Sequence, residues 1–167
     1  MVGTRLFEWA KGRRSREDDF ETLLGDRRAW VFRLALKIVE SAEEAEDVTQ
    51  VALTAAWTMR GTLRDTQKLD AWLRQIVVRT SLNHLRAHRE AAVLVDESAL
   101  RPSDEESVLV HSTLARMKPE HRALLALAVG EGLSYREMAQ ALGIPEGTVS
   151  SRLNAAKCEF RSLWEAD

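Results

Sequence analysis

The sequence has little that would support a disulfide scaffold, a membrane anchor or a secretory signal. It contains one cysteine, Cys158, which excludes a disulfide within the chain and a zinc site built from several cysteines. No apolar run approaches the roughly 20 residues of a membrane-spanning helix. Arg5 and Glu8 stand where a secretory signal needs apolar residues. We therefore expect a soluble protein of the cytoplasm.

The chain also lacks an excess of basic charge. Lys and Arg number 24 against 26 Asp and Glu, which gives a net charge of −2. Such a chain does not coat nucleic acid by charge alone, so contact with nucleic acid must be local or shared with a basic partner. Apolar residues make up 45% of the 167 positions, which favours a folded chain over a disordered one.

Helix signals are dense from the N-terminus onward. Residues 1–15 are interpreted as a variable leader or a helix extension. Ser15 and Asp18 resemble a capping pair that opens a short helix to Leu24. Gly25 is expected to end that helix.

Three further helices are predicted in the first half of the chain. Residues 27–40 are apolar on nearly every side, so this helix belongs in the middle of a bundle. Ser41 and Glu44 form a capping box for a helix that runs to about Arg60. A polar loop over 61–70 precedes a helix that runs from Ala71 to about Arg89. The apolar side of the helix after Ser41 consists of Val48, Val51, Ala52, Ala55, Ala56 and Met59.

The composition then becomes acidic. Five acidic residues and Pro102 lie between residues 96 and 106, so we interpret residues 91–105 as a linker. Ser103 and Glu106 supply another capping box, which opens a helix to about Met117.

The C-terminal segment has the layout of a helix-turn-helix unit. Pro119 opens a helix to Gly130, and a capping box of Ser134 with Glu137 opens a short amphipathic helix. Gly143 follows at the position of a left-handed helix end, and a last helix covers residues 148–164.

Three residues favour close crossing of the last two helices: Ala139 is small, Gly143 accepts the turn, and Val149 faces inward. An ordinary pair of antiparallel helices uses the same signals, so the pattern alone leaves both interpretations open.

Two sets of motifs resemble the extracytoplasmic-function group of bacterial sigma factors. Residues 133–153 (LSYREMAQALGIPEGTVSSRL) resemble the region that reads the −35 promoter element. The resemblance covers about residues 17–164, in family order. In the N-terminal half it rests on residues 42–50 (AEEAEDVTQ), Ala56-Trp57, residues 71–76 (AWLRQI) and residues 81–86 (SLNHLR).

The resemblance implies an all-α fold of two small helical domains joined by the acidic linker. Residues 16–90 correspond to a sigma region 2-like bundle, and residues 106–167 to a sigma region 4-like helix-turn-helix domain. The implied partners are promoter DNA, an anti-sigma factor, and core RNA polymerase through the clamp coiled coil of its large subunit and its flap region. The implied role is promoter-specific transcription initiation in a stress or envelope response.

Candidate site residues follow from the resemblance. The implied polymerase-binding positions are Glu43, Glu46, Asp47 and Gln50. An acidic run such as Glu43, Glu46 and Asp47 is usually just a solvated helix face, and that interpretation stays open. By this resemblance, residues 63–69 correspond to the family's loop that reads the −10 promoter element and holds a base flipped out of the stack. The implied contacts to that base and its phosphates are Arg64, Asp65, Thr66, Gln67 and Lys68. The phosphate-binding candidates on the following helix are Arg74, Arg79, Arg86 and Arg89. Trp72 is interpreted as a core residue rather than a base-stacking platform.

The −35 candidates lie on the last helix: Thr148, Ser150, Ser151, Arg152, Asn154, Ala155 and Lys157. Here the chain departs from its family, which usually has Lys at the position of Ser150 and Arg at that of Ala155. Val51 also stands where an acidic residue is common. The missing charges imply weaker −35 binding or more affinity supplied by polymerase.

No catalytic set, cofactor site or metal site is expected. His84 and His88 have a spacing that suits zinc, but the sequence shows no third ligand nearby. Cys158 is interpreted as a spacer rather than a thiol sensor.

Two alternatives remain open. A sigma mimic that does not read promoters is favoured slightly by Ser150 and Ala155. A stand-alone helix-turn-helix regulator leaves the N-terminal half unexplained, and an enzyme is the most remote possibility.

Overall fold

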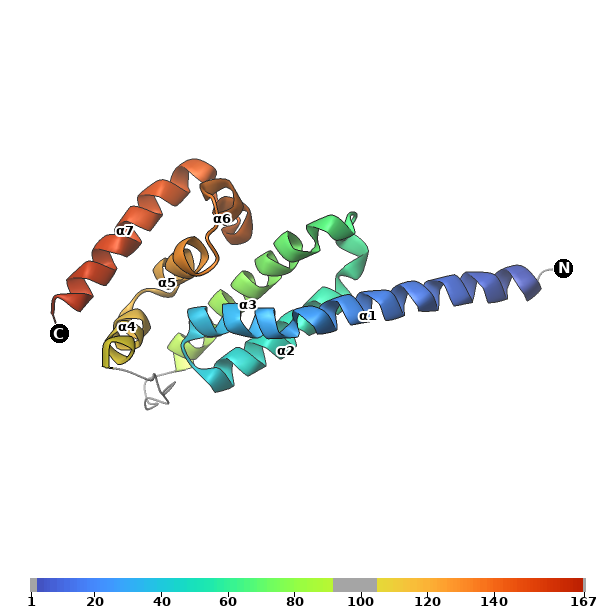
Figure 1. The fold of residues 1–167 in the computed structure, drawn as a ribbon, viewed down its shortest axis with the longest axis horizontal. Helices are drawn as coiled ribbons and strands as arrows, with labels where there is room; N and C mark the ends of the chain where they lie inside the picture. Colours follow the sequence, from blue (N-terminus) through green and yellow to red (C-terminus); the bar gives the residue numbers. More distant parts are fainter. Residues whose placement is uncertain (1–2, 92–104, 167) are drawn as a thin grey trace.

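The computed structural model describes residues 3–91 and 105–166, and this part of the chain consists of helices without strands (Figure 1). The N-terminal half contains α1 (Gly3–Val39), α2 (Ala42–Thr58), two 3-10 turns (Arg60–Thr62 and Thr66–Lys68) and α3 (Leu69–Ala91). The C-terminal half contains α4 (Glu105–Arg116), α5 (Pro119–Leu125), a π-helical turn (Ala126–Gly130), α6 (Tyr135–Leu142) and α7 (Glu146–Trp164). Within these residues no helix has the length and apolar character needed to cross a membrane.

The first helix corrects two sequence predictions. Residues 3–15 of the expected leader or helix extension, the short helix to Leu24 and the helix predicted over 27–40 form one continuous helix, α1, which ends at Val39 and contains Gly25. A glycine in a helix costs about 1 kcal/mol relative to alanine, and burial of neighbouring residues on both sides outweighs that cost. Leu24 is buried before the glycine, and Val31 and Leu34 are buried after it. The N-terminal part of α1 projects beyond the other helices (Figure 1).

Helices α1, α2 and α3 form a bundle in the N-terminal half. The Ser41 hydroxyl caps α2 by accepting a hydrogen bond from the Glu44 amide at 3.4 Å, which is one half of the predicted capping box. The inward face of α2 contains Ala45, Val48, Thr49, Ala52 and Ala56. Val51 and Met59, predicted to be on the apolar side, are instead 57% and 43% exposed. Both residues lie at the edge of the apolar side of α2. The alanines in the middle of that side let α2 pack closely on a narrow face, so its edges stay exposed.

The C-terminal half confirms the predicted helix signals. Pro119 occupies the first turn of α5, and Ser134 and Glu137 form a reciprocal capping box at the start of α6. Gly143 ends α6 in the left-handed conformation, with φ of +65°. Ala139 and Val149 are buried between the last helices. Helix α7 begins two residues earlier than predicted, at Glu146.

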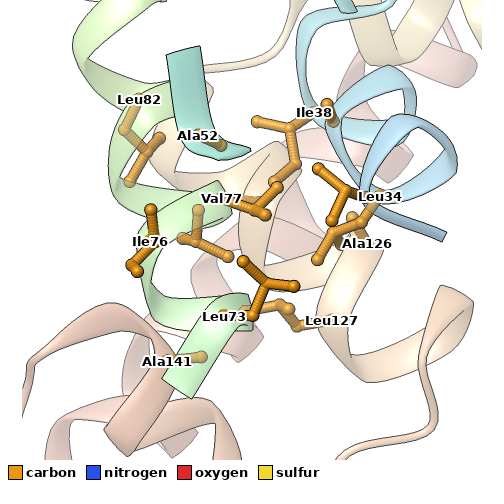
Figure 2. Packing of buried hydrophobic residues seen from close by; sticks show 14 of the residues in the cluster. Leu34, Ile38, Ala52, Leu73, Ile76, Val77, Leu82, Ala126, Leu127 and Ala141 are labelled. Atoms are coloured by element: carbon orange, nitrogen blue, oxygen red, sulfur yellow. The ribbon is translucent and has the colours of Figure 1, made fainter. Parts of the chain in front are cut away.

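The two halves share one apolar core, which the sequence did not predict. Helix α3 contacts α1 and α2 on one side and α5 and α6 on the other. Figure 2 shows Leu73 of α3 beside Leu127 of the C-terminal half, with Val77 lying toward Leu34 of α1. All four side chains are fully buried. Each such burial contributes about 1.5–3 kcal/mol, so apolar packing holds the halves together.

Most of the predicted linker lies outside the described residues. Residue 91 belongs to α3 and residue 105 to α4. Ser103, the proposed cap of the helix that follows, also lies outside the described residues.

Replacing Gly25 by alanine is expected to stabilise the fold. A Cβ at this position meets nothing within 4 Å, so Gly25→Ala gains helix propensity without a clash. We expect a gain of about 0.5–1 kcal/mol in the free energy of unfolding by urea titration. Gly143→Ala is the matched control: its φ of +65° makes the same substitution cost about 1–2 kcal/mol. A Gly25→Ala variant that loses stability would contradict the continuous helix.

Candidate nucleic-acid and polymerase interfaces

The outward face of α2 presents the predicted polymerase-binding residues together. Glu43, Glu46, Asp47 and Gln50 are all exposed. Glu46 forms an ion pair with Arg28 of α1. The exposed Val51 adds an apolar spot beside these side chains. The surface therefore combines acidic groups with a small apolar contact, which a basic partner with an apolar centre would fit.

The loop before α3 is held at both ends and leaves its polar side chains outward. Leu69 is buried at its end. The Asp65 carboxylate accepts a hydrogen bond from the Gln67 amide at 2.9 Å and so caps the second 3-10 turn. The exposed residues of the loop are Arg64, Thr66, Gln67 and Lys68. Asp65 is thus committed to the loop backbone, whereas its neighbours present side chains to solvent.

Trp72 packs in an aromatic cluster beside this loop. Its ring lies edge-on to Phe20 of α1 at 6.4 Å, and Phe20 also contacts Trp57 at 6.2 Å. The Arg60 guanidinium lies 4.6 Å from the Trp57 ring. Trp72 is half-buried against the core, in agreement with its interpretation as a packing residue.

The outward face of α7 is the predicted −35 surface. Val149, Leu153 and Ala156 face the core, and helical geometry therefore places the opposite face toward solvent. The exposed candidates there are Ser151, Arg152, Asn154, Ala155 and Lys157, whereas Thr148 and Ser150 are half-buried. The Ser151 hydroxyl donates a hydrogen bond to the Thr148 carbonyl at 3.0 Å. Most of the set therefore shares one accessible surface.

Lys157 lies at the edge of that surface and also lines an apolar groove. The groove has a volume of about 760 Å³ and is lined by residues from the end of α1 and from α4, α5 and α7. Phe160 and Trp164, which stack on each other at 5.8 Å, form part of its wall. Lys157 therefore belongs to both the predicted −35 surface and the lining of this groove.

Two of the arginines predicted to hold promoter phosphates have contacts of their own, Arg74 within the N-terminal half and Arg86 with the C-terminal half. The Arg74 guanidinium lies 5.5 Å from the Trp30 ring of α1, and its enclosed Nε has no hydrogen-bond partner among the described residues. Arg86 donates to the Glu120 carboxylate of α5 at 3.1 Å. Arg79 is exposed but lines a cleft of about 490 Å³ whose other wall includes Gly143 and the end of α6. The side chain of Arg89 lies outside the described set.

Glu131 is the centre of a charged contact between the halves. Its carboxylate accepts hydrogen bonds from the Trp30 indole and the Lys37 ammonium, each at 2.9 Å. Lys37 also donates to the Gly130 carbonyl at 2.9 Å. Burial raises the pKa of Glu131, but these hydrogen bonds and the charges of Lys37 and Arg74 outweigh it, so the pKa lies below its ordinary value. The carboxylate is therefore held ionised against α1.

The π-helical turn explains how Glu131 reaches α1. The Glu131 amide donates to the Ala126 carbonyl at 3.0 Å, five residues back, and this wider turn ends the helix with Gly130 and Glu131 facing Lys37. Such turns occur frequently at functional sites. The sequence carries no signal for it.

A second charged cluster lies at the end of α1. Glu40 has φ of +64°, a left-handed conformation usually taken by glycine at a helix end. Its carboxylate contacts His111 Nδ1 of α4 at 2.7 Å and is 7% exposed. Burial raises the pKa of Glu40 despite the nearby charges of His111 and Arg122. Burial likewise lowers the pKa of Arg122, although Glu40 and Glu44 act against it. Charged residues inside apolar helix patterns were the only sequence signal for this cluster.

Comparison with known proteins assigns the two halves separately. Residues 23–91 match the family model "Sigma-70 region 2", and residues 107–157 match "Sigma-70, region 4". The chain is 32% identical over 145 residues to the ECF RNA polymerase sigma factor SigL of Mycobacterium tuberculosis, which covers 80% of this chain and 82% of SigL. It is 29% identical over 163 residues to the RNA polymerase sigma-H factor of Pseudomonas aeruginosa, covering 80% and 84% of the two chains.

Solved structures share the arrangement of both halves. The sigma factor RpoE in complex with the anti-sigma factor NepR from Bartonella quintana has a TM-score of 0.73 at 24% identity, covering 89% of this chain and 98% of that one. CnrH in complex with the cytosolic domain of CnrY has a TM-score of 0.66, also at 24% identity, covering 89% and 88%. These likenesses establish the fold. Together with the relatives and the two matched regions, they place the chain in the extracytoplasmic-function (ECF) group of sigma-70 family RNA polymerase sigma factors.

Proposed function

We propose that this sigma factor binds core RNA polymerase through the outward face of α2 and directs it to promoters read by the loop over 63–69 and by α7. The division into residues 16–90 and 106–167, with a linker over 91–105, is part of this proposal, as is action in the cytoplasm without catalysis. The observation that carries it is the helix-turn-helix unit of α6 and α7. Its capping box and left-handed Gly143 are formed, and the outward face of α7 is accessible.

The chemistry of α7 supports reading of a −35 element. Asn154 suits bidentate recognition of adenine, and Arg152 suits guanine. Ser151 and Thr148 suit contacts to phosphate or base edges. Alanine at 155 supplies no charge, so this surface holds fewer phosphates than a helix with basic residues there, and polymerase must provide much of the affinity.

The described arrangement is a closed form of the sigma factor. The Arg74 guanidinium lies against Trp30 of α1 and its charge helps to lower the pKa of Glu131, and Arg86 is hydrogen-bonded to Glu120 of α5. In this form the Arg74 guanidinium lies against the Trp30 ring, and one nitrogen of the exposed Arg86 guanidinium is bonded to Glu120. We infer that α5 and α6 move away from α3 before the −10 element is bound.

An anti-sigma partner is part of the proposed control. Two structural neighbours are a sigma factor bound to an anti-sigma factor and CnrH bound to CnrY. A partner that favours the closed form would keep both promoter-reading surfaces from acting together. A stress or envelope signal that releases the partner completes the proposal.

The sigma mimic stays the second candidate, because Ser150 and Ala155 lack the usual charges of the family. Run-off transcription with purified core polymerase on a promoter library separates the two functions. New start sites that depend on this protein support initiation. Core binding without a specific transcript would favour the mimic.

Asp47→Arg is expected to weaken binding to core polymerase at least tenfold, which corresponds to about 1.4 kcal/mol. The substitution places a positive charge in the centre of the acidic α2 face while leaving the core unchanged, since Asp47 is exposed. Fluorescence anisotropy with labelled protein measures the dissociation constant. Glu165→Arg, an exposed site at the C-terminal end of the chain, is the control for charge reversal. Equal effects of the two variants would contradict a specific interface on α2.

Restoring the missing charges with Ser150→Lys and Ala155→Arg is expected to strengthen promoter binding by the holoenzyme. Each new phosphate contact steepens the dependence of log affinity on log salt by about 0.9. The slope is measured by filter binding at salt concentrations from about 50 to 200 mM, where log affinity falls linearly with log salt. Asn154→Ala in the same background is expected to reduce discrimination at one base pair without changing the slope. Unchanged salt slopes would place α7 away from the DNA.

Glu131→Gln is expected to increase the ratio of open to closed molecules about fivefold, which corresponds to about 1 kcal/mol for a weakened charged hydrogen-bond set. Resonance energy transfer between Cys158 on α7 and a dye at Thr54→Cys on α2 measures the ratio. Because the pKa of Glu131 is lowered when the halves are packed, its contribution is present above the ordinary carboxyl pKa of about 4.3. It is lost as pH falls through the lower pKa, so the variant and the parent should converge in acid. If the open-to-closed ratios of the variant and the parent still differ in acid, ionisation of Glu131 is not the cause of the difference. Glu165→Gln is the control.

A further inference from the structure

Three potential metal ligands meet between the start of α2 and the end of α3. One carboxylate oxygen of Glu44 and one imidazole nitrogen each of His84 and His88 lie within 4.8 Å of one another. The two imidazole rings lie 4.2 Å apart, tilted by 35°. The sequence showed only the histidine pair, because Glu44 lies on another helix and reaches the pair through the α2–α3 packing.

The inner histidine has an unsatisfied nitrogen. Nε2 of His84 is enclosed and has no hydrogen-bond partner within the part of the chain that the structure describes. The Glu44 Oε1 atom lies 3.8 Å from this nitrogen, too far for a hydrogen bond. An enclosed polar atom without a partner destabilises the fold, and a ligand shared by the two groups removes that cost.

The gap between the two atoms suits a shared cation. Zinc bonds to imidazole nitrogen and carboxylate oxygen are about 2.0–2.2 Å long, so two such ligands in tetrahedral geometry lie about 3.4 Å apart. Binding therefore requires the 3.8 Å gap between Glu44 Oε1 and His84 Nε2 to shorten by a few tenths of an ångström. His88 is exposed, which leaves an entry path and a fourth position for water.

We propose that Glu44, His84 and His88 form a binding site for a divalent first-row transition metal ion, with zinc as the probe. Two imidazoles and one carboxylate are ligands typical of zinc and of the neighbouring ions in that row. The bound ion links α2 to α3, the two helices assigned here to polymerase and promoter binding. The charge of Glu44 also acts on Arg122, which belongs to the charged cluster at the end of α1.

Titration of the full chain with zinc by calorimetry tests the site, in a Cys158→Ser background that removes the single thiol. We expect saturation at one ion per chain. His88→Ala and Glu44→Gln should each weaken binding at least tenfold, because loss even of a group that only orients a ligand costs about 10- to 100-fold in metal affinity. With cobalt in place of zinc, the visible absorption of the bound ion should be lost in the same two variants.

His111→Ala is the matched control, since it removes a histidine outside the set and should leave zinc affinity unchanged. Circular dichroism of each variant establishes that the helices are retained. The proposal is overturned if zinc binding does not saturate, if His111→Ala weakens it as much as His88→Ala does, or if Glu44→Gln has no effect. The last result would reduce the site to a pair of surface histidines.

Discussion

Helix α3 is buried on two sides, and the rest of the structure depends on that burial. Leu73 and Val77 carry no exposed surface, and Ile76 and Val78 are also buried on adjacent positions of the helix. One set of these residues completes the bundle with α1 and α2, and the other receives α5 and α6. Because these side chains are covered partly by each half, the closed arrangement is the form in which all four leave water.

The charged contacts around α3 give this packing its orientation. Glu131 and Glu40 each bring a carboxylate from one half against donors from the other. Partly buried ion pairs contribute little net stability, since desolvation offsets attraction, and we infer that they specify how the halves meet. Arg74 lies against Trp30, the donor to Glu131, and α3, the helix assigned to promoter binding, also contacts α5 and α6.

The weak charge of the chain agrees with this division of labour. A net charge of −2 and an α7 surface without Lys at 150 or Arg at 155 limit what the isolated protein can do on DNA. The acidic face of α2 is the complementary feature. These two surfaces fit the proposed action on promoters together with core polymerase, in keeping with membership of the sigma family.

The sequence by itself determined the local structure: the caps at Ser41 and Ser134, the left-handed turn at Gly143, and the inward residues of α7. These features depend on neighbours within a few positions, so pattern and propensity suffice to predict them. It did not determine that α1 continues through Gly25, that Glu131 contacts α1, or that Glu44 joins His84 and His88. Only the tertiary structure decided these, because each depends on surfaces of separate helices that become neighbours when apolar burial brings them together.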